Sequence, residues 1–103
     1  MLSKIKKCFR ENMVIYTSHA KKEMIEEEFG NIKEQEVFEA IMSGEVIENY
    51  DNAKPYPSKL IYGKSKQDKP LHVVCAFSEE DNLSIIITVY QPNPDLWYEY
   101  RRR

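Results

Sequence analysis

Long apolar runs are missing from this chain of 103 residues. None approaches the roughly 18 residues that a membrane-spanning helix needs, so we expect no membrane segment. The N-terminal stretch carries lysines but no apolar core followed by small residues, and we therefore expect no secretory signal. Hydrophobic residues still make up 42% of the chain, which is typical of a folded protein rather than a disordered tail. These features predict a single cytoplasmic domain over residues 1–103.

Cysteine is scarce too, and its placement argues against a metal site. Cys8 and Cys75 lie far apart and form no CxxC pair or cysteine–histidine cluster. Because metal ligands at short spacing are missing, we expect neither a zinc site nor another cofactor. Two free thiols of a cytosolic protein are the favoured interpretation, and a single disulfide is the alternative.

The net charge of −2 is small, but the charges are segregated along the chain. Residues 1–12 and 52–70 are basic, residues 23–51 are strongly acidic, and the chain ends in three arginines. Such a polarised surface suits a nucleic acid or an acidic partner on its basic side and a basic partner on its acidic side. A simply solvated acidic helix face is the alternative interpretation.

Apolar residues recur at helical spacing through the first part of the chain. Thr17 or Ser18 can cap the second helix, and Gly30 and Gly44 stand where the second and third helices are expected to end. A short extended piece, residues 13–16, separates the first two helices. The expected helices cover residues 3–11, 17–29 and 31–43.

After Gly44 the apolar pattern changes from helical spacing to alternation, which indicates strands. Residues 92–103 begin with proline and are expected to form a short C-terminal helix, with Trp97 and Tyr100 available to pack on the sheet. The expected strands cover residues 45–50, 59–65, 71–78 and 83–91. This order predicts an α+β fold, in which N-terminal helices pack on a four-stranded, mainly antiparallel sheet and a short C-terminal helix follows.

Alternation in the last two strands separates a core face from a less buried face. If these strands pair as a hairpin, His72 falls across from Tyr90, with Thr88 at the same end. The sequence therefore predicts an imidazole, a phenol and a hydroxyl at one rim of the sheet, a register that a bulge would shift. The residues expected on the core face are Leu71, Val73, Cys75, Phe77, Leu83, Ile85, Ile87 and Val89.

Histidine occurs only twice, as His19 and His72. His19 is expected in the first turn of the second helix, where an imidazole can serve as a general base or make a structural contact. His72 can take part in the same chemistry or simply bond to a neighbouring hydroxyl. For both residues the two interpretations stay open.

The segment "KPYPSK", residues 54–59, presents Tyr56, Ser58 and Lys59 on a loop stiffened by two prolines. A rigid aromatic ring beside a lysine suits stacking on a nucleobase together with a phosphate contact. A plain connection between strands is the alternative.

Five short motifs follow one another between residues 16 and 97: "SHAKKEM", "GNIKEQEVFEAIMSGEVIENY", "YPSKLIYG", "PLHVV" and "IIITVYQPNPDLW". Their order and spacing resemble the bacterial and archaeal family called domain of unknown function 4258. In that family the histidine falls on His19 and the final T-V-Y motif on Thr88, Val89 and Tyr90. Many members carry arginines in the helix after the histidine, at positions that are Glu23 and Glu27 here.

The resemblance implies a small toxin of a toxin–antitoxin pair. Similar proteins look like members of the RelE, barnase and colicin-type ribonuclease fold, often encoded beside a small zinc-finger antitoxin of the MqsA kind. By that analogy the chain is expected to cleave RNA without a metal, by acid/base chemistry and with cations around the phosphate. The alternatives are a non-catalytic module that binds a protein or a nucleic acid, and a small structural protein that pairs through its sheet edge.

The first hypothesis names specific side chains. The expected catalytic residues are His19, His72 and Tyr90. The expected substrate-binding residues are Lys22, Tyr56, Ser58, Lys59, Thr88 and Arg101.

Overall fold

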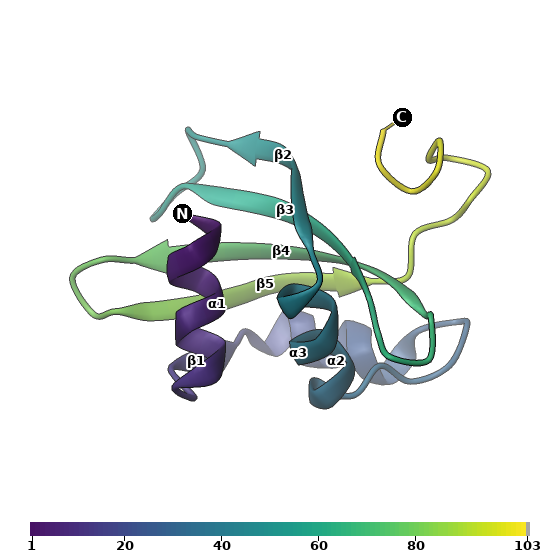
Figure 1. The fold of residues 1–103 in the computed structure, drawn as a ribbon, viewed down its shortest axis with the longest axis horizontal. Helices are drawn as coiled ribbons and strands as arrows, with labels where there is room; N and C mark the ends of the chain where they lie inside the picture. Colours follow the sequence, from purple (N-terminus) through teal and green to yellow (C-terminus); the bar gives the residue numbers. More distant parts are fainter. Residues whose placement is uncertain (103) are drawn as a thin grey trace.

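The structure, a computed structural model, describes residues 1–102 and has the predicted α+β class (Figure 1). The strands form one sheet in the order β1-β5-β4-β3-β2. No helix within residues 1–102 is long and apolar enough to cross a membrane. The helices and strands of the described residues are α1 (Leu2–Arg10), β1 (Val14–Tyr16), α2 (Ser18–Glu26), α3 (Glu34–Met42), β2 (Glu45–Tyr50), β3 (Ser58–Lys64), β4 (Pro70–Ser78) and β5 (Leu83–Tyr90).

The start of α2 is fixed by Thr17, one of the two predicted caps. Its hydroxyl accepts a hydrogen bond from the amide of Ala20 at 3.1 Å and donates one to the carbonyl oxygen of Ile87 at 3.2 Å. The same side chain therefore caps the helix and attaches it to β5. The helix ends at Glu26, before the predicted end at Phe29.

The prediction of four strands was wrong, because residues 14–16 join the sheet as β1. This strand pairs in parallel with β5, with Val14 beside Ser84 and Tyr16 beside Ile86. The other neighbours pair antiparallel, as predicted. A run of three residues is too short to show a strand period, and its partner lies far away in the sequence, so local pattern could not reveal this pairing.

The predicted C-terminal helix is also absent from the described residues. Residues 91–102 form turns, and Tyr98 pairs with Arg102 in an isolated bridge. Glu99 and Tyr100 have φ values of 49° and 64°, in the left-handed region that a right-handed helix cannot contain. The expectation that Trp97 and Tyr100 pack on the sheet is confirmed by their ring contacts with His72 and Tyr62.

A bulge in the pairing of β4 with β5 changes which residues of β5 face the core. The register shifts between Val74 and Cys75, so that Thr88 lies beside Val74 but Ile86 lies beside Cys75. Ile86 is consequently fully buried in the core cluster, and the prediction that Ile85 and Ile87 face the core was wrong. The predicted core face of β4 and the core position of Val89 are confirmed.

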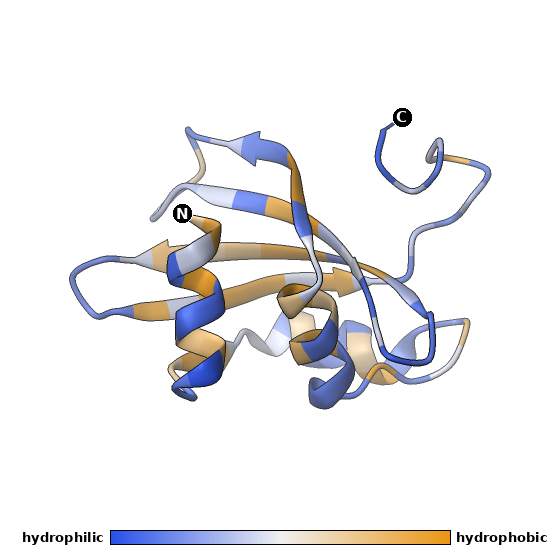
Figure 2. Cartoon of the chain, viewed as in Figure 1, coloured by the Kyte–Doolittle hydropathy of each residue, from blue (hydrophilic) through white to orange (hydrophobic). Residues whose placement is uncertain are grey.

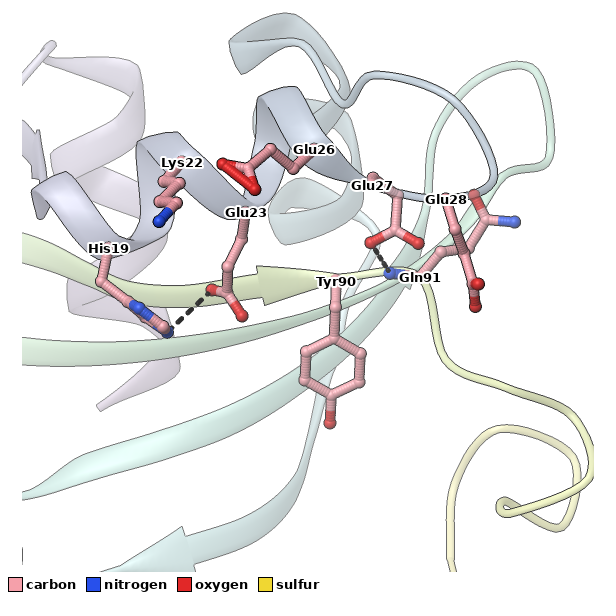
Figure 3. A pocket seen from close by; sticks show the side chains of 8 residues that line it. All are labelled: His19, Lys22, Glu23, Glu26, Glu27, Glu28, Tyr90 and Gln91. Atoms are coloured by element: carbon pink, nitrogen blue, oxygen red, sulfur yellow. Dashed lines mark hydrogen bonds and ion pairs between the residues drawn. The ribbon is translucent and has the colours of Figure 1, made fainter.

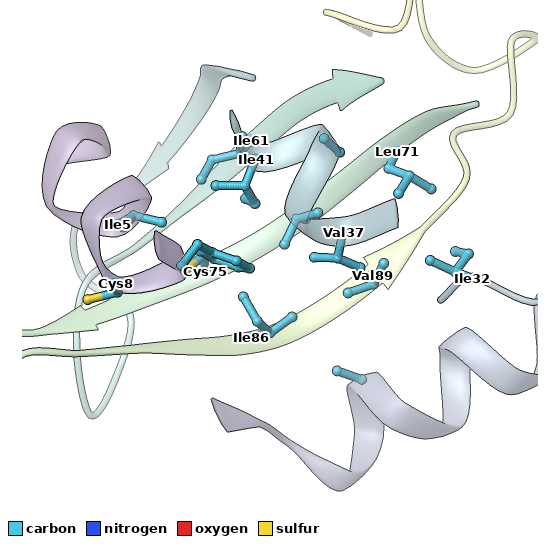
Figure 4. Close-up of a cluster of buried hydrophobic side chains, with 14 of the residues drawn as sticks. Ile5, Cys8, Ile32, Val37, Ile41, Ile61, Leu71, Cys75, Ile86 and Val89 are labelled. Atoms are coloured by element: carbon cyan, nitrogen blue, oxygen red, sulfur yellow. The ribbon is translucent and has the colours of Figure 1, made fainter. Parts of the chain in front are cut away.

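The three helices cover one face of the sheet, and the apolar positions of β4 and β5 run beneath them (Figure 2). Figure 4 shows side chains from α1, α3 and the sheet meeting in this core. The contact between α3 and β3 is especially close. A Cβ atom on Gly63 would lie 1.8 Å from the carbonyl oxygen of Ala40, so only glycine fits there.

We expect Gly63→Ala to lower the free energy of unfolding by about 3 kcal/mol, because the added methyl group meets helix backbone that cannot rotate away. Urea unfolding followed by circular dichroism measures this loss. Lys64→Ala, at the neighbouring exposed position, is the control and should change stability by less than about 0.5 kcal/mol. Equal stability of the two variants would contradict the close contact.

Candidate functional site

A cleft of about 520 Å³ lies between α2 and the end of β5 (Figure 3). The exposed imidazole of His19 stands at one end of it, and Tyr90 lines the opposite wall. Two of the three predicted catalytic residues therefore line one cavity. The lining residues are His19, Lys22, Glu23, Glu26, Glu27, Glu28, Tyr90 and Gln91.

His19 is 67% exposed and lies beside Glu23, one helical turn further on. Its Nε2 atom is 3.4 Å from Oε1 of Glu23. The carboxylate can therefore orient the ring. Because the imidazole remains open to solvent, it can also reach a molecule bound in the cleft.

Glu23 and Glu27 have a second role, which is to complete the edge of β5. The strand β1 pairs only with residues 84–86, so later amides of β5 have no strand beside them on that edge. Glu23 accepts a hydrogen bond from the amide of Val89 at 3.1 Å, and Glu27 accepts one from the amide of Gln91 at 3.3 Å.

The spacings of the helix and the strand explain why these bonds fit. Four residues of helix advance about 6 Å and two residues of strand advance about 6.6 Å. Carboxylates on Glu23 and on Glu27, the C-cap residue four positions further on, can therefore meet strand amides that are two residues apart. At these two positions α2 takes the place of a neighbouring strand.

His72 pairs with Tyr90 across the strands, as the sequence predicted. Its Nδ1 atom is 3.1 Å from the Tyr90 hydroxyl, and its Nε2 atom is 2.6 Å from the carbonyl oxygen of Tyr100. A carbonyl can only accept, so in the neutral ring Nε2 carries the proton and Nδ1 accepts the bond from Tyr90. The imidazole thus fixes the direction in which the phenol donates.

His72 lies on the predicted face of the sheet, but that face is not open at this point. The side chain is fully buried, and the indole of Trp97 stands edge-on to it with 4.3 Å between ring centroids. The C-terminal segment runs on the side away from the helices (Figure 1), and its Trp97 covers His72 there. His72 can therefore reach the cleft only through Tyr90.

The other predicted binding residues do not gather around the cleft, apart from Lys22. Ser58 is buried beside Ala76, four residues along β4 from His72, which is about 13 Å along the strand. Lys59 donates to the side chain of Asn49. Tyr56 stands in the preceding loop and Thr88 on β5, and neither lines the cleft.

Arg101 lies at a different cavity, on the other side of the C-terminal segment. It forms an ion pair with Glu45, and its guanidinium lies 5.1 Å from the ring centroid of Tyr62. The prediction missed the other five residues of the cleft, which are Glu23, Glu26, Glu27, Glu28 and Gln91. The four-residue spacing of Glu23 and Glu27 was the available signal, but their partners could not be recognised without the strand edge.

The two cysteines are free and buried, as favoured. Burial raises the pKa of the Cys75 thiol to about 12, so the reactive thiolate is essentially absent near neutral pH. Among residues 1–102, no three histidine, cysteine or acidic side chains come together in a way that could hold a metal ion. The cleft is therefore the best candidate site in the described part of the chain.

These features define a small α+β protein whose exposed histidine and sheet tyrosine share an acidic cleft. The family model described as "Domain of unknown function (DUF4258)" matches residues 16–91, so the chain belongs to that family. The match includes α2, all of the sheet except part of β1, and every residue that lines the cleft. No curated protein and no solved structure matches the chain significantly.

We expect Glu23→Ala to cost about 1 kcal/mol of stability, because the amide of Val89 loses its acceptor. Glu23→Gln should recover most of this loss, since the amide side chain still offers an oxygen. Urea unfolding compares the variants with Glu26→Ala, an exposed position on the same helix that should have little effect. A loss in Glu26→Ala as large as that in Glu23→Ala would show that helix charge, not the hydrogen bond, is responsible.

Proposed function

We propose that the protein is a toxin-type ribonuclease that cleaves RNA by acid/base chemistry, without a metal, in the cleft between α2 and β5. One observation carries the proposal. The imidazole of His19 and the phenol of Tyr90 line the same cleft, and the Tyr90 hydroxyl is held by buried His72. Two proton-transfer groups on opposite walls are what in-line cleavage of a phosphodiester needs.

Tyr90 and His72 act together as the base. The Tyr90 oxygen takes the proton of the RNA 2′-hydroxyl while the phenolic proton passes to Nδ1 of His72. The 2′-oxygen attacks the phosphorus, and the bond between phosphorus and the 5′-oxygen breaks. The products are a 2′,3′-cyclic phosphate and a free 5′-hydroxyl, and the proton on His72 returns to solvent through Tyr90.

His19 acts as the acid and donates a proton to the leaving 5′-oxygen. The carboxylate of Glu23, 3.4 Å away, orients the imidazole for this step. Lys22 supplies positive charge beside the phosphate within the cleft. The charges of Glu23 and Glu27 are partly offset because each carboxylate already accepts a backbone amide.

We expect His19→Ala and Tyr90→Phe each to slow RNA cleavage by about 100-fold or more, because each removes one proton-transfer step. Cleavage of a single-stranded RNA, with and without ribosomes, is measured by the appearance of 2′,3′-cyclic phosphate ends. The wild-type rate should follow a bell-shaped pH profile that loses one limb in each variant. Lys21→Ala, exposed on α2 but outside the cleft, is the control and should keep the wild-type rate.

RNA that stays intact both free and on ribosomes would contradict the ribonuclease proposal. Cleavage that needs added divalent metal would contradict the acid/base mechanism. In the cell we propose that the enzyme acts in the cytoplasm and is restrained by a small zinc-finger antitoxin. A short reading frame with Cys-x-x-Cys pairs beside the gene would support that partner.

A second function, non-catalytic binding of a basic segment of a partner protein, is favoured by the charge of the cleft. Four glutamates line it, against the single lysine Lys22. Such a surface repels a phosphate backbone and attracts lysine and arginine side chains. In this alternative His19 and Tyr90 contribute hydrogen bonds and no chemistry.

Glu26→Lys distinguishes the two functions, because it changes the cleft by two charges and removes no hydrogen bond of the backbone. For a ribonuclease we expect RNA affinity and cleavage rate to rise several-fold at low salt. For a basic-segment binder we expect no cleavage and weaker binding of an arginine-rich peptide. Glu80→Lys, exposed in the turn between β4 and β5, is the matched control for net charge.

A further inference from the structure

We infer that the aromatic surface formed by Tyr62, His72 and Tyr90 is a binding site for a base of single-stranded RNA, and that the C-terminal segment occupies this site as a displaceable strap. The strap is defined as residues 92–102. The inference rests on the proposed function, because it names where RNA lies next to the cleft. The proposed base site lies on the side of Tyr90 that contacts His72, whereas the cleft lies on the side that faces α2.

The surface is built from three rings, the imidazole of His72 and the two phenol rings on either side of it. The centroid of His72 lies 5.9 Å from that of Tyr62 and 5.2 Å from that of Tyr90, both in edge-on arrangements. These residues stand on three neighbouring strands, so the sheet holds them rigidly. Stacking on such rings is how proteins bind the bases of a single strand.

What occupies the surface indicates what it can bind. The indole of Trp97 packs against His72, and the ring of Tyr100 stacks on Tyr62 at 6.0 Å and 29°. The carbonyl oxygen of Tyr100 lies 2.6 Å from Nε2 of His72. The strap thus presents flat rings and an acceptor oxygen, and a nucleobase with a ring carbonyl presents the same two features in one group.

The strap is held differently from the rest of the chain. It contains no helix and no strand of the sheet, and two of its residues, Glu99 and Tyr100, have positive φ. Leu96 and Tyr98 are 67% and 60% exposed, so only alternate parts of the strap contact the sheet. Its ion pair between Arg101 and Glu45 is on the surface, where such pairs contribute little.

Release of the strap would also supply positive charge that the cleft lacks. Arg101 is paired with Glu45, and Arg102 lies over the ring of Tyr98 at 4.9 Å. When the strap leaves the sheet, Arg101 loses its contact with Glu45 and its guanidinium becomes available to the phosphates that flank the bound base, while Arg102 stays beside Tyr98 and moves with the strap. Bases of the RNA then take the places of the Trp97 and Tyr100 rings, and Arg101 lies along the RNA backbone.

Trp97 makes the exchange measurable, because it is the single tryptophan of the chain and is only 7% exposed. The probe is a short single-stranded oligodeoxynucleotide with a fluorescent label, which has no 2′-hydroxyl and so survives the proposed reaction. Binding is followed by anisotropy of the label, and strap release by the emission of Trp97. We expect the emission to shift to the red in proportion to the bound fraction.

Variants of the full chain test the same competition. Trp97→Ala should bind the oligonucleotide about tenfold more tightly, because a main contact of the strap is gone. Tyr62→Ala should bind it more weakly. Arg101→Glu places a second carboxylate beside Glu45, and this repulsion, rather than the loss of the ion pair, should shift the emission of Trp97 to the red without ligand. Glu45→Arg added to it should reverse the shift. Circular dichroism checks that each variant is folded. If Trp97→Ala does not fold, the variants Arg101→Glu and Arg101→Glu with Glu45→Arg test the displacement instead.

Three results would overturn the inference: no binding of the oligonucleotide, binding without a change in Trp97 emission, or weaker binding by folded Trp97→Ala. The last would mean that Trp97 is part of the ligand surface rather than its competitor. Failure of the proposed function is separate. Displacement of Trp97 without RNA cleavage would support the base-binding site and contradict the ribonuclease proposal. Cleavage with unchanged Trp97 emission would contradict only the displaceable strap.

Discussion

The hydrogen bonds from the edge of β5 to Glu23 of α2 and to Glu27, the residue that follows the helix, determine how the rest of the site is arranged. An amide at a sheet edge needs an acceptor, and β1 is too short to provide one beyond Ile86. Glu23 and Glu27 provide it, so α2 lies along the strand at a fixed height and rotation. His19, one turn before Glu23, is thereby carried to the mouth of the cleft.

The sequence predicted the elements that depend on local periodicity, and it failed for β1 and for part of β5, where contacts between distant parts of the backbone determine the structure. Helical spacing located the three helices, and alternation located four strands and the pairing of His72 with Tyr90. The pairing of β1 was missed because three residues show no period. The faces of Ile85 and Ile87 were missed because a bulge leaves no mark in the pattern of apolar residues.

The candidate site was predicted in part for the same reason. His19, Lys22 and Tyr90 were found, because a helix start and a strand end are local features. Their relation to Glu23 and Glu27 required knowing which amides of β5 lack a strand neighbour. The burial of His72 required knowing that residues after β5 turn back over the sheet, which their proline-rich start alone does not reveal.

Near the bulge at Ile87, the residues that attach α2 to β5 are different from most of the residues that set the charge of the cleft. Because the strand turns there, the Ile87 carbonyl reaches the hydroxyl of Thr17, and α2 is attached to β5 at its beginning as well as along its length. The contacts that hold the helix are then confined to the side that faces the strand. The exposed side chains of Lys22, Glu26 and Glu28 line the cleft without taking part in these hydrogen bonds. Substitutions at these exposed positions can therefore change whether the cleft attracts a polyanion or a polycation without removing a contact that holds the fold.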